Sequence, residues 1–152
     1  MDRHLGHLAR WLRTLGQDTY FQVDASRDDL HHQLEVEGSV FVTTSEELAH
    51  AVGAQKMIIV TQENAASQLQ AISAVLEHPL EKAMFTRCVI CNAPVHPVKR
   101  GDVRDRVPEA VVAKTDTFTM CPVCDRVYWE GTHTARLRRR LKFLLSGDPD
   151  QD

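Results

Sequence analysis

The sequence predicts an α/β fold, in which a parallel sheet with helices on both faces is followed by a small C-terminal zinc ribbon. Up to about residue 80, short apolar strands alternate with segments of helical periodicity, which is the pattern of strand–helix–strand units. Beyond residue 86 the pattern changes to short β-prone pieces around two Cys-x-x-Cys pairs. The 152 residues suffice for one ordinary domain, or for a small domain and a metal-bound module.

The first helix is predicted over residues 5–15. One face carries five apolar residues at helical spacing: Leu5, Leu8, Ala9, Leu12 and Leu15. The opposite face carries four basic residues: Arg3, His7, Arg10 and Arg13. Gly16 stands where a glycine commonly ends a helix. We therefore expect the leucines to be buried and the arginines to face solvent.

The following elements continue the alternation. Strands are predicted at residues 19–23, 39–43 and 57–60, and helices at residues 26–37, 44–53 and 65–77. Two of these helices begin with residue pairs typical of a capping box, Ser26 with Asp29 and Thr44 with Glu47. Residues 1–80 are thus predicted to form the first domain, residues 81–146 the ribbon with a C-terminal basic helix, and residues 147–152 an acidic tail.

All four cysteines of the chain lie in the two Cys-x-x-Cys pairs: Cys88, Cys91, Cys121 and Cys124. Two such pairs provide the four thiolates of a closed, tetrahedral structural zinc site. Asn92 and Asp125 follow the pairs and tolerate the tight turns of a zinc knuckle. The alternative is two disulfides, which the absence of any signal peptide disfavours. The long interval from Cys91 to Cys121 predicts an insertion or an extra strand pair.

The charges are distributed unevenly between the two parts. Residues 1–85 contain six Lys and Arg against twelve Asp and Glu, and residues 86–145 contain twelve against six. This asymmetry is typical of a metal-using site beside a polyanion-binding surface, or of two surfaces that attract each other. No apolar run is long enough to cross a membrane, and with no targeting segment we expect a cytoplasmic protein.

Both ends of the chain resemble the PIN-like RNase family named for the C-terminal domain of the Mut-seven exonucleases. The first end is the run Asp2-Arg3-His4-Leu5-Gly6-His7-Leu8-Ala9-Arg10-Trp11-Leu12-Arg13-Thr14-Leu15-Gly16. The second end comprises Arg87-Cys88 to Cys91-Asn92, Val107-Pro108, Cys121-Pro122 to Cys124 and Tyr128-Trp129-Glu130-Gly131-Thr132-His133. The resemblance implies a PIN-like domain, a zinc ribbon and a ribonuclease whose carboxylates hold catalytic Mg²⁺ or Mn²⁺.

The resemblance also implies which carboxylates would hold the catalytic ion. Asp2 matches the first family acid, Asp28 or Asp29 would replace the second, and Glu46 or Glu47 would replace the third. At the second and third positions the chain has Arg27 and Ser45 instead of the family acid. The family strand that precedes the first acid is also missing, so either the chain begins upstream of Met1 or the sheet lacks that strand.

Seven residues are candidates for contacts with RNA: Arg3, Arg10, Arg13, His133, Arg138, Arg139 and Arg140. The arginines of residues 136–142 form the densest basic cluster, on a helix predicted to bury Leu137, Leu141 and Leu144 or Leu145. Two functions follow as hypotheses. The first is a metal-dependent ribonuclease, and the second is a catalytically degenerate module that binds RNA or a protein partner on the same fold.

Overall fold

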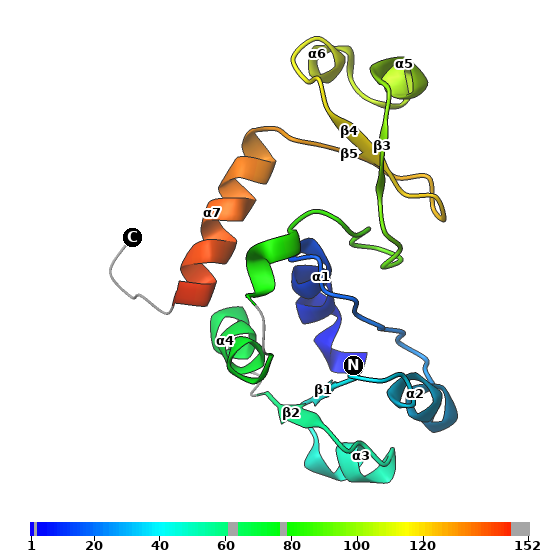
Figure 1. The fold of residues 1–152 in the computed structure, drawn as a ribbon, viewed down its shortest axis with the longest axis vertical. Coiled ribbons are helices and arrows are strands. Elements are labelled where there is room, and N and C mark those ends of the chain that lie inside the picture. The colour runs from blue at the N-terminus through cyan, green and yellow to red at the C-terminus, as the bar shows by residue number, and fades with distance from the viewer. Residues whose placement is uncertain (2, 61–63, 77–78, 147–152) are drawn as a thin grey trace.

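The computed structural model describes residues 1, 3–60, 64–76 and 79–146, and it is a mixed α/β structure (Figure 1). The first part consists of η1 (Arg3–Leu5), α1 (Gly6–Thr14), α2 (Arg27–Leu34), β1 (Phe41–Thr43), α3 (Glu46–Ala51), β2 (Met57–Ile59), α4 (Ala65–Val75) and η2 (Leu80–Ala83). The second part consists of β3 (His96–Val98), α5 (Arg100–Val103), η3 (Arg104–Arg106), α6 (Glu109–Val112), β4 (Phe118–Met120), β5 (Val127–Trp129) and α7 (Thr132–Ser146).

Strands β1 and β2 form a small parallel sheet that separates two apolar clusters. Because successive side chains of a strand point to opposite faces, Val42 and Ile58 pack into one cluster while Phe41 and Met57 pack into the other. Helices α1, α4 and α7 contribute to the first cluster, and α2 and α3 to the second. The expected parallel sheet with helices on both faces is thus present, with two strands in the described residues.

The leucine stripe of α1 lies at the centre of the first cluster, as the sequence predicts. Its five members are at most 4% exposed. Gly16 ends the helix with a φ of +87°, and a Cβ built there would lie 1.9 Å from the carbonyl oxygen of Ala83. Glycine is therefore required at this position both by the left-handed backbone and by the close approach of η2.

The C-terminal helix α7 belongs by its packing to the first part of the chain. Leu141 is fully buried in the same cluster as the α1 leucines, and Leu137, Leu144 and Leu145 pack against that cluster. Gln70 of α4 donates a hydrogen bond to the carbonyl of Leu144 across 3.1 Å, and Figure 1 shows the two helices side by side. The sequence predicts these buried leucines correctly, but it gives no sign that they cover the first part.

The second part contains an antiparallel sheet in the order β3–β4–β5. The long interval between the two cysteine pairs forms α5, η3 and α6 in addition to strands, and these helices enclose a small core. That core consists of Val103, Val107, Val112 and Phe118. The predicted insertion is therefore confirmed, and it contains three short helical segments.

The predicted strand at residues 19–23 is wrong, because side chains and the amino terminus occupy its backbone groups. The carbonyl of Thr19 accepts from Arg13, its N–H donates to Asn92, and the carbonyl of Tyr20 accepts from the ammonium group of Met1. A strand needs those groups for a neighbouring strand. No strand is assigned to this segment among the described residues.

Several helix limits also differ from expectation. Helix α2 ends at Leu34 rather than at residue 37, and α4 ends at Val75 rather than at residue 77. The N-cap of α3 is Ser45, whose hydroxyl accepts from the Leu48 N–H, and not Thr44. The predicted acidic tail at residues 147–152 lies outside the described residues. Among the described helices, none has the length and apolar character needed to span a membrane.

Candidate functional site

The four cysteines converge on one point. All four sulfur atoms lie within 4.8 Å of one another, with Sγ–Sγ distances of 3.3 Å for Cys91–Cys121 and 3.5 Å for Cys88–Cys124. A disulfide would require about 2.05 Å, whereas a tetrahedral ion with Zn–S bonds of about 2.3 Å separates its sulfurs by about 3.8 Å. The arrangement therefore fits a four-thiolate zinc site, and it does not fit two disulfides.

Each cysteine pair lies in a backbone turn of the same kind. Cys88 accepts from the Asn92 N–H and Cys121 from the Asp125 N–H, at 2.9 and 3.0 Å, through their carbonyl oxygens. Asn92 and Asp125 have φ angles of +71° and +55°. Asn and Asp adopt this left-handed region more readily than other side chains, which confirms why these residue types follow the pairs.

The thiols differ in their tendency to ionise. Burial disfavours the Cys88 thiolate, but N–H groups of Cys91 and Ile90 and the hydroxyl of Tyr128, 3.1 Å away, stabilise it and lower its pKa to about 6. Burial raises the pKa of Cys91 to about 12. Because zinc binds thiolates, metal must displace protons from this cluster, and its affinity will fall at low pH.

A single guanidinium, that of Arg13, joins the first knuckle to α1. Nη1 of Arg13 donates to the carbonyls of Ile90 and Val89 at 2.6 and 3.3 Å, inside the Cys88–Cys91 turn. Its Nε and Nη2 donate to the carbonyl of Thr19 at 3.1 and 2.9 Å. The side chain is 5% exposed, so the expected solvent-facing position of Arg13 is wrong. Its donors are used by backbone carbonyls, and a role in phosphate binding does not follow.

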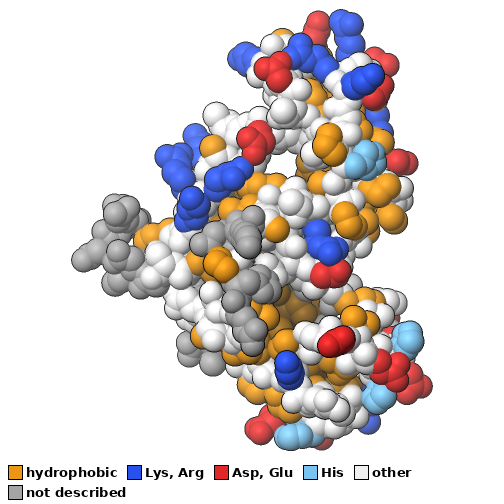
Figure 2. Space-filling model, in the orientation of Figure 1, with side chains coloured by type: hydrophobic (Ala, Val, Ile, Leu, Met, Phe, Trp, Pro, Cys, Tyr) orange, Lys and Arg blue, Asp and Glu red, His pale blue; other side chains and the backbone are white. Residues whose placement is uncertain are grey.

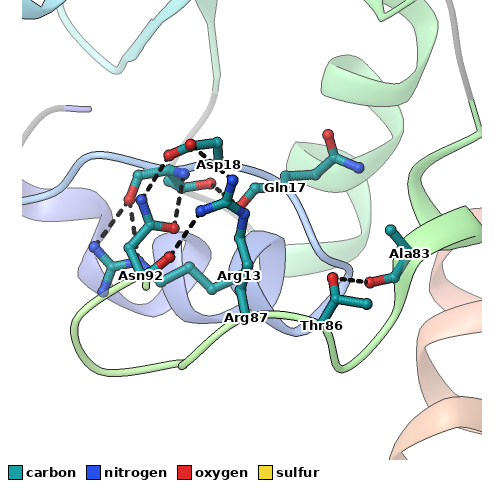
Figure 3. Close-up of polar contacts among 8 residues, drawn as sticks. Arg13, Gln17, Asp18, Ala83, Thr86, Arg87 and Asn92 are labelled. Carbon is teal, nitrogen blue, oxygen red and sulfur yellow. Dashed lines mark hydrogen bonds and ion pairs between the residues drawn. The ribbon is translucent and has the colours of Figure 1, made fainter. Parts of the chain in front are cut away.

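A second set of contacts completes this junction. Asn92 donates to Asp18 at 2.7 Å and accepts from the Thr19 N–H at 3.0 Å, and Arg87 bridges the Asn92 carbonyl and the Asp18 carboxylate, each at 2.8 Å (Figure 3). Burial lowers the pKa of Arg13, while the thiolates of Cys88 and Cys91 oppose that shift. A zinc site with four thiolates is net negative, so the two arginines supply the opposite charge beside it.

The predicted catalytic acids do not come together in the described residues. Asp29 accepts from the N–H and hydroxyl of Ser26 at 2.9 and 2.7 Å, and these bonds complete a capping box and lower its pKa. Asp28 is exposed in the first turn of α2, and the exposed Glu46 lies 3.7 Å from His50. Among the described residues, three or more potential metal ligands come together at one place, which is the cysteine cluster.

An open pocket of about 700 Å³ lies beside the carboxyl end of β1. It is lined by residues that include Met1, His4, Asp24, Arg27 and Ser45. Asp24 is a carboxylate that sequence reasoning missed, because it stands in the loop before α2, where no periodic signal marks it. Asp2, the first predicted acid, directly follows Met1 in sequence but lies outside the described residues.

The basic residues predicted to contact RNA occupy two places. Figure 2 shows Lys and Arg side chains gathered over α7, where His133, Arg139 and Arg140 are exposed. Arg138 is half-buried, pairs with Glu130 at 2.7 Å and covers the ring of Phe85. Arg3 lies in η1, and Arg10 is exposed on α1.

Arg140 also connects α7 to α1. Its guanidinium carbon lies 5.6 Å from the ring centroid of Trp11, which in turn packs edge-on against His7. Such cation–π contacts contribute roughly 0.5–1 kcal/mol at exposed sites and leave the remaining N–H groups available. The basic surfaces of α7 and α1 are therefore adjacent.

Comparison with known families accounts for nearly the whole chain. Residues 1–141 match a family model described as Mut7-C RNAse domain. The match includes the leucine stripe, both knuckles and α7 up to Leu141, and the chain therefore belongs to this family. No curated protein and no solved structure matches the chain.

We predict that the purified protein holds one zinc ion per chain. Cys91→Ser and Cys121→Ser should each lower zinc affinity by orders of magnitude, because hydroxyl oxygens replace thiolates poorly in such sites. The measurement is zinc content by elemental analysis and release to a chromophoric chelator.

Val123→Ser is the matched control, because Val123 lies between two of the cysteines in the same turn and is 70% exposed. This variant should keep wild-type zinc content. If wild-type protein purified under reducing conditions contained no zinc, the result would contradict the assignment.

Proposed function

We propose that this chain, as a member of the Mut7-C RNAse domain family, is a ribonuclease-type domain that binds RNA and carries a structural zinc. The observation that carries this proposal is the family match over residues 1–141. The four converging thiols support the zinc. A closed four-thiolate site has no open position for a substrate, so RNA cleavage must occur elsewhere on the molecule.

The architecture supports a PIN-like first domain and a zinc ribbon. Strands β1 and β2 are parallel and have helix-lined clusters on both faces, as a PIN-like sheet would have. The antiparallel sheet β3–β4–β5 lies next to two knuckles of the same backbone geometry. We adopt both assignments as part of the proposal.

We place the candidate cleavage site in the pocket beside the carboxyl end of β1. Ligands of open α/β sheets bind outside the carboxyl ends of the strands. Asp24, Met1 and Arg27 line this pocket. In the sequence, Asp2 directly follows Met1 and Asp28 directly follows Arg27. Carboxylates of this kind would hold Mg²⁺ or Mn²⁺, which would orient a water molecule and stabilise charge on the phosphate.

A second candidate function is RNA binding without cleavage. It is favoured by the scarcity of free carboxylates at the pocket: among its described lining residues Asp24 is the acid present, and Asp29 is engaged as a cap. At the end of β1, Ser45 uses its side chain as the N-cap of α3 where the family implies an acid. Whether the chain cleaves RNA therefore depends on Asp2, Asp24 and the residue at position 45.

We predict that Ser45→Asp raises metal-dependent cleavage of RNA by roughly tenfold or more, because it adds a carboxylate at the pocket. The substitution is mild for the fold, since Asp caps helices as well as Ser does. Ser45→Asn is the matched control: it keeps the cap without the charge and should leave cleavage unchanged. The assay measures the rate at which labelled RNA is cleaved in the presence of Mg²⁺ or Mn²⁺, at fixed zinc occupancy.

The variant Asp2→Asn, measured in the same assay, tests whether this pocket is the cleavage site. If the first function holds, it should lower wild-type cleavage by orders of magnitude. Cleavage by Ser45→Asp alone, with none by wild type, would establish the second function. Cleavage that neither Asp2→Asn nor Ser45→Asp changes would show that the pocket is not the cleavage site.

We further predict that RNA binds through the basic side of α7. Each phosphate neutralised on single-stranded RNA contributes about −0.7 to the slope of log affinity against log salt. The triple variant Arg138→Gln, Arg139→Gln, Arg140→Gln should therefore weaken binding similarly for all RNA sequences and flatten the slope by about 2. Fluorescence anisotropy with labelled RNA across a salt series measures both quantities.

A second triple variant provides the control for net charge. It removes three exposed basic residues from the far end of the cysteine-containing part: Lys99→Gln, Arg104→Gln and Lys114→Gln. It should retain most of the affinity and the salt slope. Equal losses in the two triple variants would mean that RNA responds to net charge rather than to α7.

A further inference from the structure

A pocket of about 500 Å³ opens between the head of α7, strand β5 and the segment that follows η2. Strand β5 and the start of α7 follow each other in sequence, whereas the segment after η2 lies about forty residues earlier. The exposed surface of the lining is mainly apolar, although four threonines, Arg87 and Glu130 also contribute, and the volume lies in the range of small-molecule sites. It is separate from the pocket beside β1.

Three aromatic side chains line this pocket, namely Phe85, Tyr128 and Trp129. Trp129 is 37% exposed, so part of its ring surface is accessible to a ligand. Tyr128 is held by its hydroxyl contact with the Cys88 sulfur, so one wall is fixed by the cysteine cluster. The pocket therefore presents aromatic surface on a rigid support.

Phe85 reaches this pocket from an unfavourable backbone conformation. Its φ of +64° is rare for a bulky side chain, and conformations of this kind cost about 1–3 kcal/mol. Its N–H donates to the carbonyl of Thr14 at the end of α1, at 2.8 Å, which holds the residue in position. Packing of the neighbouring core does not require this ring, because Phe85 is not among the residues of the first apolar cluster or those packed against it.

The pocket lining contains one arginine, Arg87, and one glutamate, Glu130, and the basic side of α7 borders it. Thr134 and Leu137 of α7 line it, and Arg138 lies over the Phe85 ring, 5.0 Å from the ring centroid. Arg138 also pairs with Glu130 at the rim. The exposed Arg139 follows directly on α7, so the basic surface proposed for RNA borders the aromatic pocket.

We propose that this pocket binds an unpaired nucleobase, stacked on the ring of Trp129 and on the face of the Phe85 ring that Arg138 leaves open, while α7 holds the flanking phosphates. The inference rests on the proposed RNA-binding function and names its substrate class: single-stranded rather than fully paired RNA. Proteins that bind single strands combine a positively charged surface with aromatic side chains on which bases stack. Both features are adjacent here.

The test compares two labelled ligands of equal charge, a ten-nucleotide oligouridine and the same backbone with abasic positions throughout. Anisotropy is measured on the zinc-loaded full chain without added Mg²⁺ or Mn²⁺. Wild type should bind oligouridine about 5- to 150-fold more tightly than the abasic strand, the range that stacking of one base on aromatic side chains provides. Phe85→Leu and Trp129→Leu should each remove much of this preference and leave abasic binding and its salt slope unchanged.

Phe143→Leu is the matched control, because Phe143 lies on α7, is 39% exposed and does not line the pocket. It should bind both ligands as wild type does. Zinc content and thermal midpoint are measured for each variant. The comparison of the two ligands on wild type needs no substitution, so the proposal stays testable if a variant misfolds.

Each outcome is decisive. Equal binding of both strands by wild type would overturn the base pocket and leave the RNA-binding function intact. Preference for oligouridine that survives in Phe85→Leu and Trp129→Leu would overturn it too and would assign the pocket to another occupant, such as an apolar peptide segment. Absence of binding to either strand would contradict the proposed RNA-binding function itself.

Discussion

The contact between Arg13 and the first knuckle is the interaction on which the arrangement of the two parts depends. One buried guanidinium donates to the carbonyl of Thr19 in the first part and to those of Val89 and Ile90 in the knuckle. A buried charge is tolerated only when its donors are satisfied, so the position of the cysteine turn and that of the loop after α1 are specified together. The same bonds use backbone groups that a strand at residues 19–23 would need, which explains why that segment joins no sheet.

Around this junction the chain assembles surfaces that neither part has alone. Helix α7 follows the cysteine-containing sheet in sequence, yet Leu141 anchors it in the core beside α1 and α4. Its apolar side therefore faces the first part while its arginines remain beside β5 and the aromatic rings of Phe85 and Trp129. The proposed RNA surface thus depends on the zinc site and on the core at the same time. The candidate cleavage pocket beside β1 lies in the first part, so binding and chemistry would use different regions.

The sequence was sufficient to predict the features whose physical cause is local or periodic. The leucine stripe, Gly16, the capping box at Ser26 and the turns at Asn92 and Asp125 all follow from spacing and backbone preference, and the structure confirms them. It was insufficient where a partner lies far along the chain. Periodicity places Arg13 on the polar face of its helix, but its acceptors at Val89 and Ile90 are more than seventy residues away. The aromatic pocket combines Phe85 with Tyr128 and Trp129, more than forty residues further along the chain, and carries no sequence pattern. The predicted catalytic carboxylates came from resemblance alone, and the described residues place Asp29 in a cap.

The most direct test of this account is the stability of Arg13→Gln compared with that of Arg10→Gln. Both remove one positive charge from α1, but Arg10 is exposed. Urea unfolding should show that Arg13→Gln lowers the free energy of unfolding by about 2–4 kcal/mol, because buried carbonyls lose their donors. Arg10→Gln should change it by no more than about 0.5 kcal/mol. Zinc release to a chelator should also be faster in Arg13→Gln alone. Equal stability and equal zinc release in the two variants would contradict the claim that Arg13 holds the knuckle and the first part together.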